Sequence, residues 1–283
     1  MQDKTMASRI FDISNYTFLL LFATATIMPF FYIISSSISS TAGFIPRDLT
    51  FEWYGFVFSN SAFLRSLSVS VLVTVAGTLV NLVLTCLMAF PLAKKELVFR
   101  KTIMMGVIFT MLFNGGMIPL YFVVRGAGML DSIWSLILPT AISAFNLIIV
   151  KNFFQNLPEE LEESAMIDGC KDLGILWRII IPLSKPVLAT FGLFYAVTHW
   201  NRYFDAILYI NNSAKWPIQV MLRQIIILSE GGDGSDPELA SLILHAQNIK
   251  MAVIIVATIP ILLIYPFLQK HFAKGVLLGS VKG

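Results

Sequence analysis

Charged side chains are scarce in this sequence. Only 13% of the 283 residues are Asp, Glu, Lys or Arg, whereas 57% are hydrophobic and the mean hydropathy is +0.77. A soluble domain ordinarily carries about 25% charged residues. The composition therefore excludes an ordinary soluble protein and predicts a chain that crosses a membrane several times. The small net charge of +3 gives no reason to expect a nucleic-acid partner.

The sequence also lacks the common signatures of catalytic chemistry. It has no G-x-x-x-x-G-K-[ST] and hence no phosphate-binding loop of its own. It has no H-E-x-x-H and no paired cysteines that would hold a metal. Its two cysteines, Cys86 and Cys170, fall in an apolar run and a polar stretch, so no disulfide is expected. We therefore predict that this chain is not an enzyme and has no cofactor or metal.

Long apolar runs are what the sequence does have. A membrane-spanning helix needs about 20 such residues. Because the first run is long for a signal peptide and other runs follow it, we expect it to be retained in the membrane. We predict one all-α domain over residues 1–283 with six transmembrane helices, at 16–38, 66–89, 102–121, 132–150, 187–210 and 251–268.

Basic residues are distributed unevenly between the loops. Thirteen of the 20 Lys and Arg residues lie in the N-terminal tail, the 90–101 turn, the stretch 151–185 and the C-terminal tail. Loops rich in Lys and Arg stay in the cytoplasm. We therefore expect both termini and the 151–185 stretch to be cytoplasmic.

The segment Pro158–Pro186 is charged but patterned like a helix, and it lies between two apolar runs. Pro158 followed by acidic residues predicts a helix start. Gly169 is expected to turn the chain, either because a side chain has no room there or because φ is positive. Pro182 and Pro186 are expected to end or bend a second helix. The apolar faces predicted for the two helices are Leu157, Leu161 and Ala165, and Leu173, Leu176, Trp177 and Ile180.

Six residues of this segment carry a recognisable spacing: Glu163, Ser164, Ala165, Gly169, Ile179 and Pro182. The pattern they match is Glu-Ala-Ala, three residues, Gly, nine residues, Ile-x-Leu-Pro, with Ser164 in place of one Ala and Ile181 in place of Leu. The segment therefore resembles the EAA loop of permeases in binding-protein-dependent ABC importers. This resemblance implies that it docks in a cleft of a cytoplasmic ATPase subunit, where its acids meet basic groups. The alternative is an ordinary solvated surface hairpin.

The end of the chain, Tyr265–Gly275 and Val281–Gly283, resembles the tail of sugar permeases related to the smaller permease subunit of the maltose system. With the EAA-like segment, the resemblance covers essentially the whole chain and implies a type I ABC importer permease fold. It also implies a second homologous permease subunit, two ATPase subunits that bind ATP and Mg, and an extracytoplasmic solute-binding protein. The expected function is alternating-access translocation of an oligosaccharide across a bacterial-type plasma (inner) membrane.

The fifth apolar run is the most polar in its second half. Trp200, Asn201 and Phe204 combine an amide with aromatic rings, which suits a sugar, so they are a candidate translocation path. Alternatively, Asn201 bonds a neighbouring helix, and Arg202 and Asp205 lie at the outer interface. Three other amides in apolar runs are expected to hold helices together: Asn81, Asn114 and Asn146.

Two other classes of protein remain to be weighed. An ion-coupled secondary transporter predicts inverted repeats and a buried acid at mid-membrane. The sequence shows no repeat, and Asp205 is too near the end of its run. A membrane scaffold without transport would not need the EAA spacing. The ATP-driven permease is therefore the favoured interpretation, and the ion-coupled transporter is the alternative.

Overall fold

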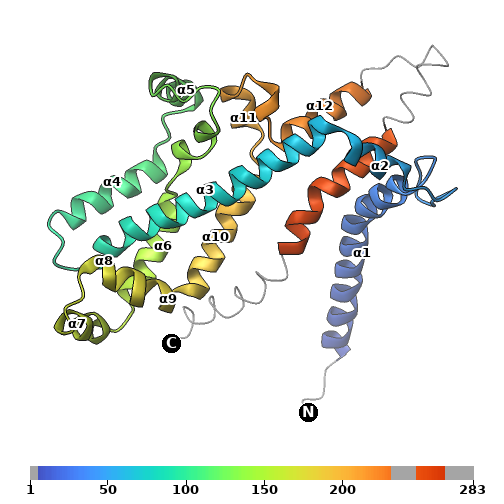
Figure 1. Ribbon diagram of the computed structural model, residues 1–283. Helices are drawn as coiled ribbons and strands as arrows, with labels where there is room; N and C mark the ends of the chain where they lie inside the picture. The colour runs from blue at the N-terminus through green and yellow to red at the C-terminus, as the bar shows by residue number, and fades with distance from the viewer. Residues whose placement is uncertain (1–5, 231–246, 265–283) are drawn as a thin grey trace. The chain divides into compact units, whose positions relative to one another are not determined.

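The computed structural model describes residues 6–230 and 247–264 (Figure 1). Helices dominate these residues, and their one β-type contact is an isolated bridge between Ser39 and Leu49. The prediction of an all-α protein is thereby confirmed. The chain separates into two compact units, residues 1–61 with 222–259 and residues 62–221 with 260–283. A single domain over 1–283 stays a prediction.

Three helices are long and apolar enough to cross a membrane by themselves. They are α1 (Met6–Ser37), α3 (Ser61–Ala93) and the helix Gln247–Ile264. Three further pairs of helices reach the required length together but are bent by 118°, 55° and 87°. The count therefore reaches six when each bent pair is taken as one span. Residues 265–268 of the sixth predicted span, and the sugar-permease-like tail, lie outside the described residues.

The first unit is tied together by polar groups after α1. The Ser39 carbonyl accepts hydrogen bonds from the Trp53 indole at 2.8 Å and from the Asn248 amide at 3.3 Å. Trp53 belongs to the short helix α2 (Glu52–Ser59). The Ser37 and Tyr54 hydroxyls bond each other at 2.8 Å. This network fixes the turn that follows α1 against α2 and the beginning of the last described helix.

The run expected to be one span at 102–121 is instead two helices. Helix α4 (Arg100–Leu112) and helix α5 (Met117–Gly126) meet at 118°. The cause lies between them, where the Asn114 side chain accepts a hydrogen bond from the Gly116 amide at 2.9 Å and Gly116 adopts φ +90°. A side-chain bond of this kind replaces the helical one. Asn114 is therefore a helix breaker and not the interhelical bond we expected.

The other predicted spans differ in their bounds. Pro139 lies in the broken segment η1 (Ile133–Leu136) and η2 (Leu138–Thr140), which precedes α6 (Ala144–Gln155) at a 55° bend. The run 187–210 is α10 (Lys185–Trp200) followed by α11 (Phe204–Tyr209). The remaining elements are η4 (Ser213–Lys215) and α12 (Ile218–Glu230).

Two apolar clusters hold the second unit. One joins α3, α4, α6 and α10 to the elements between 159 and 183, and the other joins the opposite half of α3 to α5, η1 and α11. Figure 1 shows the elements between 159 and 183 below the end of α3, and α5 and α11 above α3. Asn81 of α3 is buried and donates to the Thr140 carbonyl at 3.3 Å, which confirms the interhelical bond predicted for this amide.

Candidate functional site

The segment 158–186 forms a helical hairpin, which we call the 158–186 hairpin. Its first arm is α7 (Glu159–Ile167), which begins after Pro158 as predicted. The arm ends at Gly169, whose φ is +80°. The amide of Gly169 bonds the Met166 carbonyl at 3.0 Å, and the amide of Cys170 bonds the Ala165 carbonyl at 2.9 Å. These two bonds are the Schellman arrangement that glycine allows at a helix end.

Gly169 was expected to need either a positive φ or a tight space, and the structure decides between them. A Cβ placed on Gly169 would meet no atom within 4 Å. Glycine is therefore required here by backbone conformation and not by crowding, because L side chains rarely adopt a positive φ.

The second arm contains a π-helical segment that the sequence did not reveal. It runs from α8 (Asp172–Ile175) through η3 (Leu176–Ile180), with π geometry, to α9 (Ile181–Leu183). The residues buried along it are Ile175, Leu176 and Ile180, whereas Leu173 and Trp177 are exposed. The predicted apolar face was therefore wrong at these two positions. Large apolar residues occur on both faces of this arm, so their spacing did not show which face is buried.

The buried side of the hairpin anchors it to the helices of the second unit. Ala165, Ile175 and Ile180 belong to the same cluster as Phe90 of α3 and Phe154 of α6. Ile179 and Ile181 pack against the edge of this cluster. The second arm meets α10 at 87°, with Ser184 buried at the corner. A displacement of the hairpin must therefore also displace the ends of α3, α6 and α10.

The opposite side of the hairpin exposes large apolar residues. The most exposed is Ile167, at 87% of its surface. Four more share this exposure to a smaller degree: Leu161, Met166, Leu173 and Trp177. Beside them, Glu163 and Ser164 are exposed and Pro182 lies at the surface, while Glu163 forms no ion pair with any residue in 6–230 or 247–264. Apolar groups beside unpaired charge are a typical composition for a protein-binding surface.

Two lysines of the turn after α3 reach the acids of the hairpin. Lys94 Nζ lies 2.9 Å from Asp172 and 3.3 Å from Glu162, and Lys95 Nζ lies 2.8 Å from Glu159. Burial opposes the charge of Lys94, but the carboxylates of Asp172 and Glu162 outweigh it and raise the Lys94 pKa above its usual value. Three acids of this hairpin therefore pair with basic groups of their own chain.

Two glycines, which the sequence did not mark as important, allow α3 and α10 to pack closely. A Cβ on Gly77 would lie 2.5 Å from Nε2 of the buried His199. A Cβ on Gly192 would lie 3.2 Å from a methyl group of Leu82. Nearby, the Thr85 and Tyr195 hydroxyls bond each other at 2.8 Å. Small residues that bring two helices close are a known signal of membrane packing, but single glycines in apolar runs are too common to be diagnostic.

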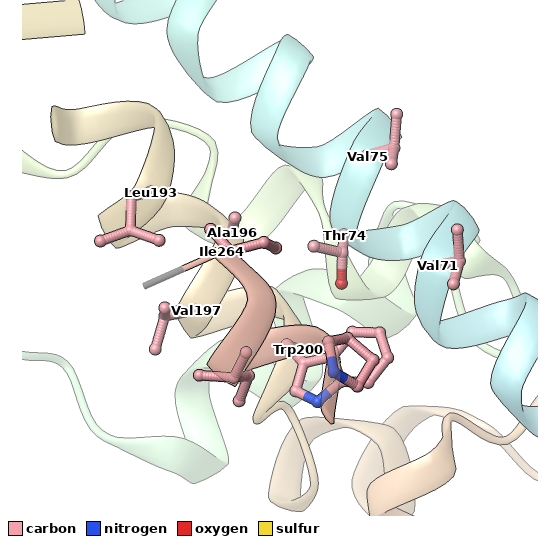
Figure 2. A pocket seen from close by; sticks show the side chains of 10 residues that line it. Val71, Thr74, Val75, Leu193, Ala196, Val197, Trp200 and Ile264 are labelled. Carbon is pink, nitrogen blue, oxygen red and sulfur yellow. The ribbon is translucent and has the colours of Figure 1, made fainter. Parts of the chain in front are cut away.

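A pocket of about 210 Å³ lies beside this helix pair. Figure 2 shows Val71, Thr74 and Val75 of α3 facing Leu193 and neighbouring residues of α10, with the Trp200 ring at one end. Ile264 from the last described helix also lines it. Among the side chains that line it, only Thr74 and Trp200 have polar atoms, so its chemistry suits an aliphatic chain better than a sugar.

The three residues proposed for the translocation path are not brought together in one pocket. Trp200 is buried and lines the pocket just described, whereas Asn201 and Phe204 are exposed and do not line it. The Asn201 amide donates to the Val197 carbonyl of its own helix at 2.9 Å. The role of these three residues in a path stays a prediction.

Arg202 is buried inside the protein and has polar partners there. Its guanidinium is buried, donates to the Leu136 carbonyl and to the Thr140 hydroxyl, the latter at 2.6 Å, and lies 3.4 Å from Asp205. It therefore closes the broken 133–140 segment against the end of α10. A buried arginine needs such partners because an unpaired charge is costly to desolvate.

Comparison with known proteins gives a consistent result over the whole chain. A family model described as "Binding-protein-dependent transport system inner membrane component" matches residues 4–278. The polygalacturonan/rhamnogalacturonan transport system permease protein YtcP of Bacillus subtilis (strain 168) is 56% identical, with 98% of this chain and 100% of that protein aligned. Protein LplC of the same organism is 54% identical, covering 99% of this chain and 97% of its own length.

A solved structure matches the fold as well as the sequence. It is the crystal structure of a bacterial ABC transporter involved in the import of the acidic polysaccharide alginate. The matched chain has a TM-score of 0.88 and 34% sequence identity, and the alignment covers 96% of this chain and 100% of that one.

Proposed function

Because the chain belongs to the family of binding-protein-dependent transport system inner membrane components, which are permeases of ABC importers, we propose that it imports an acidic oligosaccharide. Membership of this family removes the ion-coupled transporter from consideration. The substrate class is supported by two similar proteins, one named for polygalacturonan and rhamnogalacturonan and one solved from an importer of alginate. Polygalacturonan and alginate are both polymers of uronic acids.

The proposed importer contains four other components. They are a second homologous permease subunit, two ATPase subunits and an extracytoplasmic solute-binding protein. The chain has no phosphate-binding loop, so ATP and Mg would be bound by the ATPase subunits. The family's description as binding-protein-dependent supports the solute-binding protein.

The observation that supports ATP-driven transport is that the two sides of the 158–186 hairpin differ. One side is locked into the apolar cluster with α3 and α6, and the other exposes Ile167 beside Glu163. In the proposed mechanism, ATP closes the two ATPase subunits and the hairpins of both permeases move together. The ends of the membrane helices follow, and the permease pair opens outward to receive the oligosaccharide from its binding protein. The chain makes and breaks no covalent bond.

The membrane and the orientation are also part of this proposal. A multi-pass protein is consistent with the three long helices and three bent pairs. We propose that it lies in the bacterial plasma membrane with both termini and the 158–186 hairpin in the cytoplasm. The excess of Lys and Arg in the loops on that side supports this orientation.

Reconstitution in vesicles tests the function. We expect the purified chain alone to hydrolyse no ATP and to transport nothing. Co-expressed with the second permease and the ATPase, and supplied with the binding protein, it should carry galacturonate oligosaccharides inward only when ATP is present. The measurement is uptake of labelled oligosaccharide by proteoliposomes beside phosphate release.

Two controls make the result decisive. Omitting the binding protein should reduce uptake to the level without ATP. An imposed proton or sodium gradient should not replace ATP. Uptake driven by either gradient, or ATP turnover by the chain alone, would refute the proposed function.

A further inference from the structure

Lys94, in the α3–α4 turn, forms ion pairs with both arms of the 158–186 hairpin. Its Nζ donates to Asp172 at the start of α8 at 2.9 Å. The same nitrogen lies 3.3 Å from Glu162 of α7, on the other side of the Gly169 turn. It also lies 4.6 Å from the centre of the Phe90 ring, which is part of the apolar cluster at the end of α3.

Burial separates this contact from an ordinary surface ion pair. The side chains of Lys94 and Glu162 are each 25% exposed, whereas those of Lys95 and Glu159 are 66% and 74% exposed. Exposed pairs contribute little because water screens them and both side chains lose freedom. A cation held over an aromatic ring with two carboxylates is restrained in one place.

The turn that carries Lys94 is itself held firmly. Arg100 donates from Nε to the Leu92 carbonyl at 2.8 Å, which closes the end of α3. The Lys94 amide bonds the Pro91 carbonyl at 3.1 Å. Lys94 is therefore fixed to a membrane helix, while its ammonium group lies between the two arms of the hairpin.

The chain path between the arms is short and includes a glycine. Only residues 168–171 join α7 to α8, and Gly169 within them has a positive φ. A push on α7 could therefore be absorbed by rotation in this turn instead of being passed to the second arm. A second connection between the arms removes that freedom.

We propose that Lys94 is a positioning residue of the permease, which ties α7 to α8 and both arms to the end of α3. In its presence, movement of α7 is passed to α3 and to the second arm together. Without it, the ATPase can still bind and hydrolyse ATP, but part of the movement is lost in the turn. The inference rests on the proposed function, since it concerns how ATP hydrolysis is converted into transport.

The test compares oligosaccharide uptake per ATP hydrolysed in reconstituted complexes. Lys94→Met removes the charge and keeps an unbranched side chain of similar length. We expect it to lower this ratio by about tenfold, the factor that corresponds to one charge-assisted hydrogen bond. Lys94→Arg should restore the ratio, because it keeps the charge and the donors. Lys95→Met is the matched control and should change the ratio by less than about twofold.

A second variant guards against loss of folding. Glu162 is only 25% exposed, and Glu162→Gln removes the charge of this partner of Lys94 while keeping the size of the side chain. We expect it to lower the same ratio while ATPase co-purification stays normal. An unchanged ratio in Glu162→Gln, or in an assembled Lys94→Met complex, would overturn the role of Lys94. Failure of the unmodified complex to show ATP-driven uptake would instead refute the proposed function itself.

Discussion

Gly169→Val is expected to abolish oligosaccharide uptake while the chain remains inserted in the membrane at normal abundance. Gly169 has φ +80°, a conformation that costs a β-branched residue about 1–3 kcal/mol. The turn would relieve this strain by opening, at the expense of the bond from the Cys170 amide to the Ala165 carbonyl. The first arm would then shift relative to the second. The apolar cluster lies outside the turn, so the rest of the fold should survive.

The control for this variant follows from the open space around Gly169. Because a Cβ would meet nothing within 4 Å, the effect of valine must come from the backbone and not from a clash. Asparagine tolerates a positive φ, so Gly169→Asn should retain most of the uptake. Uptake is measured in proteoliposomes, with ATPase co-purification recorded for each variant. Equal uptake by Gly169→Val and the unmodified chain would show that the geometry of this turn is not used in transport.

The second large effect is expected at Gly77, where α3 meets α10. An added methyl group would lie 2.5 Å from Nε2 of His199 and 2.7 Å from two ring carbons. His199 is buried, so its ring cannot move aside freely. Gly77→Ala should therefore destabilise the folded protein by about 1–3 kcal/mol, as overpacking of a close-packed interior does. The readout is the thermal midpoint of the detergent-solubilised protein.

Two further variants isolate the cause of that loss. Gly106 lies within α4 with nothing within 4 Å of its Cβ position, so Gly106→Ala should leave the midpoint unchanged or raise it. Adding His199→Ala to Gly77→Ala should recover part of the stability by vacating the space. Two results would show that the close contact between Gly77 and His199 does not limit stability. One is an equal thermal midpoint for Gly77→Ala and Gly106→Ala, and the other is a midpoint of the double variant no higher than that of Gly77→Ala.

The hairpin was largely readable from the sequence because its signals are local. Pro158 with its acids starts α7 as predicted, and Gly169 turns the chain as predicted. The predicted face of the second arm was wrong at Leu173 and Trp177, because large apolar residues lie on both faces of this arm. The π segment Leu176–Ile180 was not predicted either, since an apolar spacing does not distinguish a π turn from an α turn.

The contacts that hold the hairpin and the broken 133–140 segment could not be predicted because they join distant residues. Lys94 and Asp172 are 78 residues apart, and Arg202 and Thr140 are 62 apart. The outer interface was one alternative for Arg202, and the sequence did not show that the Leu136 carbonyl and the Thr140 hydroxyl of the broken 133–140 segment accept its hydrogen bonds. That segment and the 118° bend at Asn114–Gly116 interrupt runs that composition describes as continuous. Hydropathy finds apolar length, but it does not show where backbone bonds are replaced by side chains.

The central claim is that the exposed side of the 158–186 hairpin binds an ATPase subunit. A photo-cross-linking amino acid placed at Ile167, which is 87% exposed, tests it most directly in cells that co-express the ATPase. Phe122 is also exposed, and its helix α5 belongs to the other apolar cluster, so it serves as the control position. We predict a covalent adduct between the chain and the ATPase from position 167 and none from position 122. Adducts from position 167 that contain no ATPase, with the ATPase present and the chain in the membrane, would contradict the account.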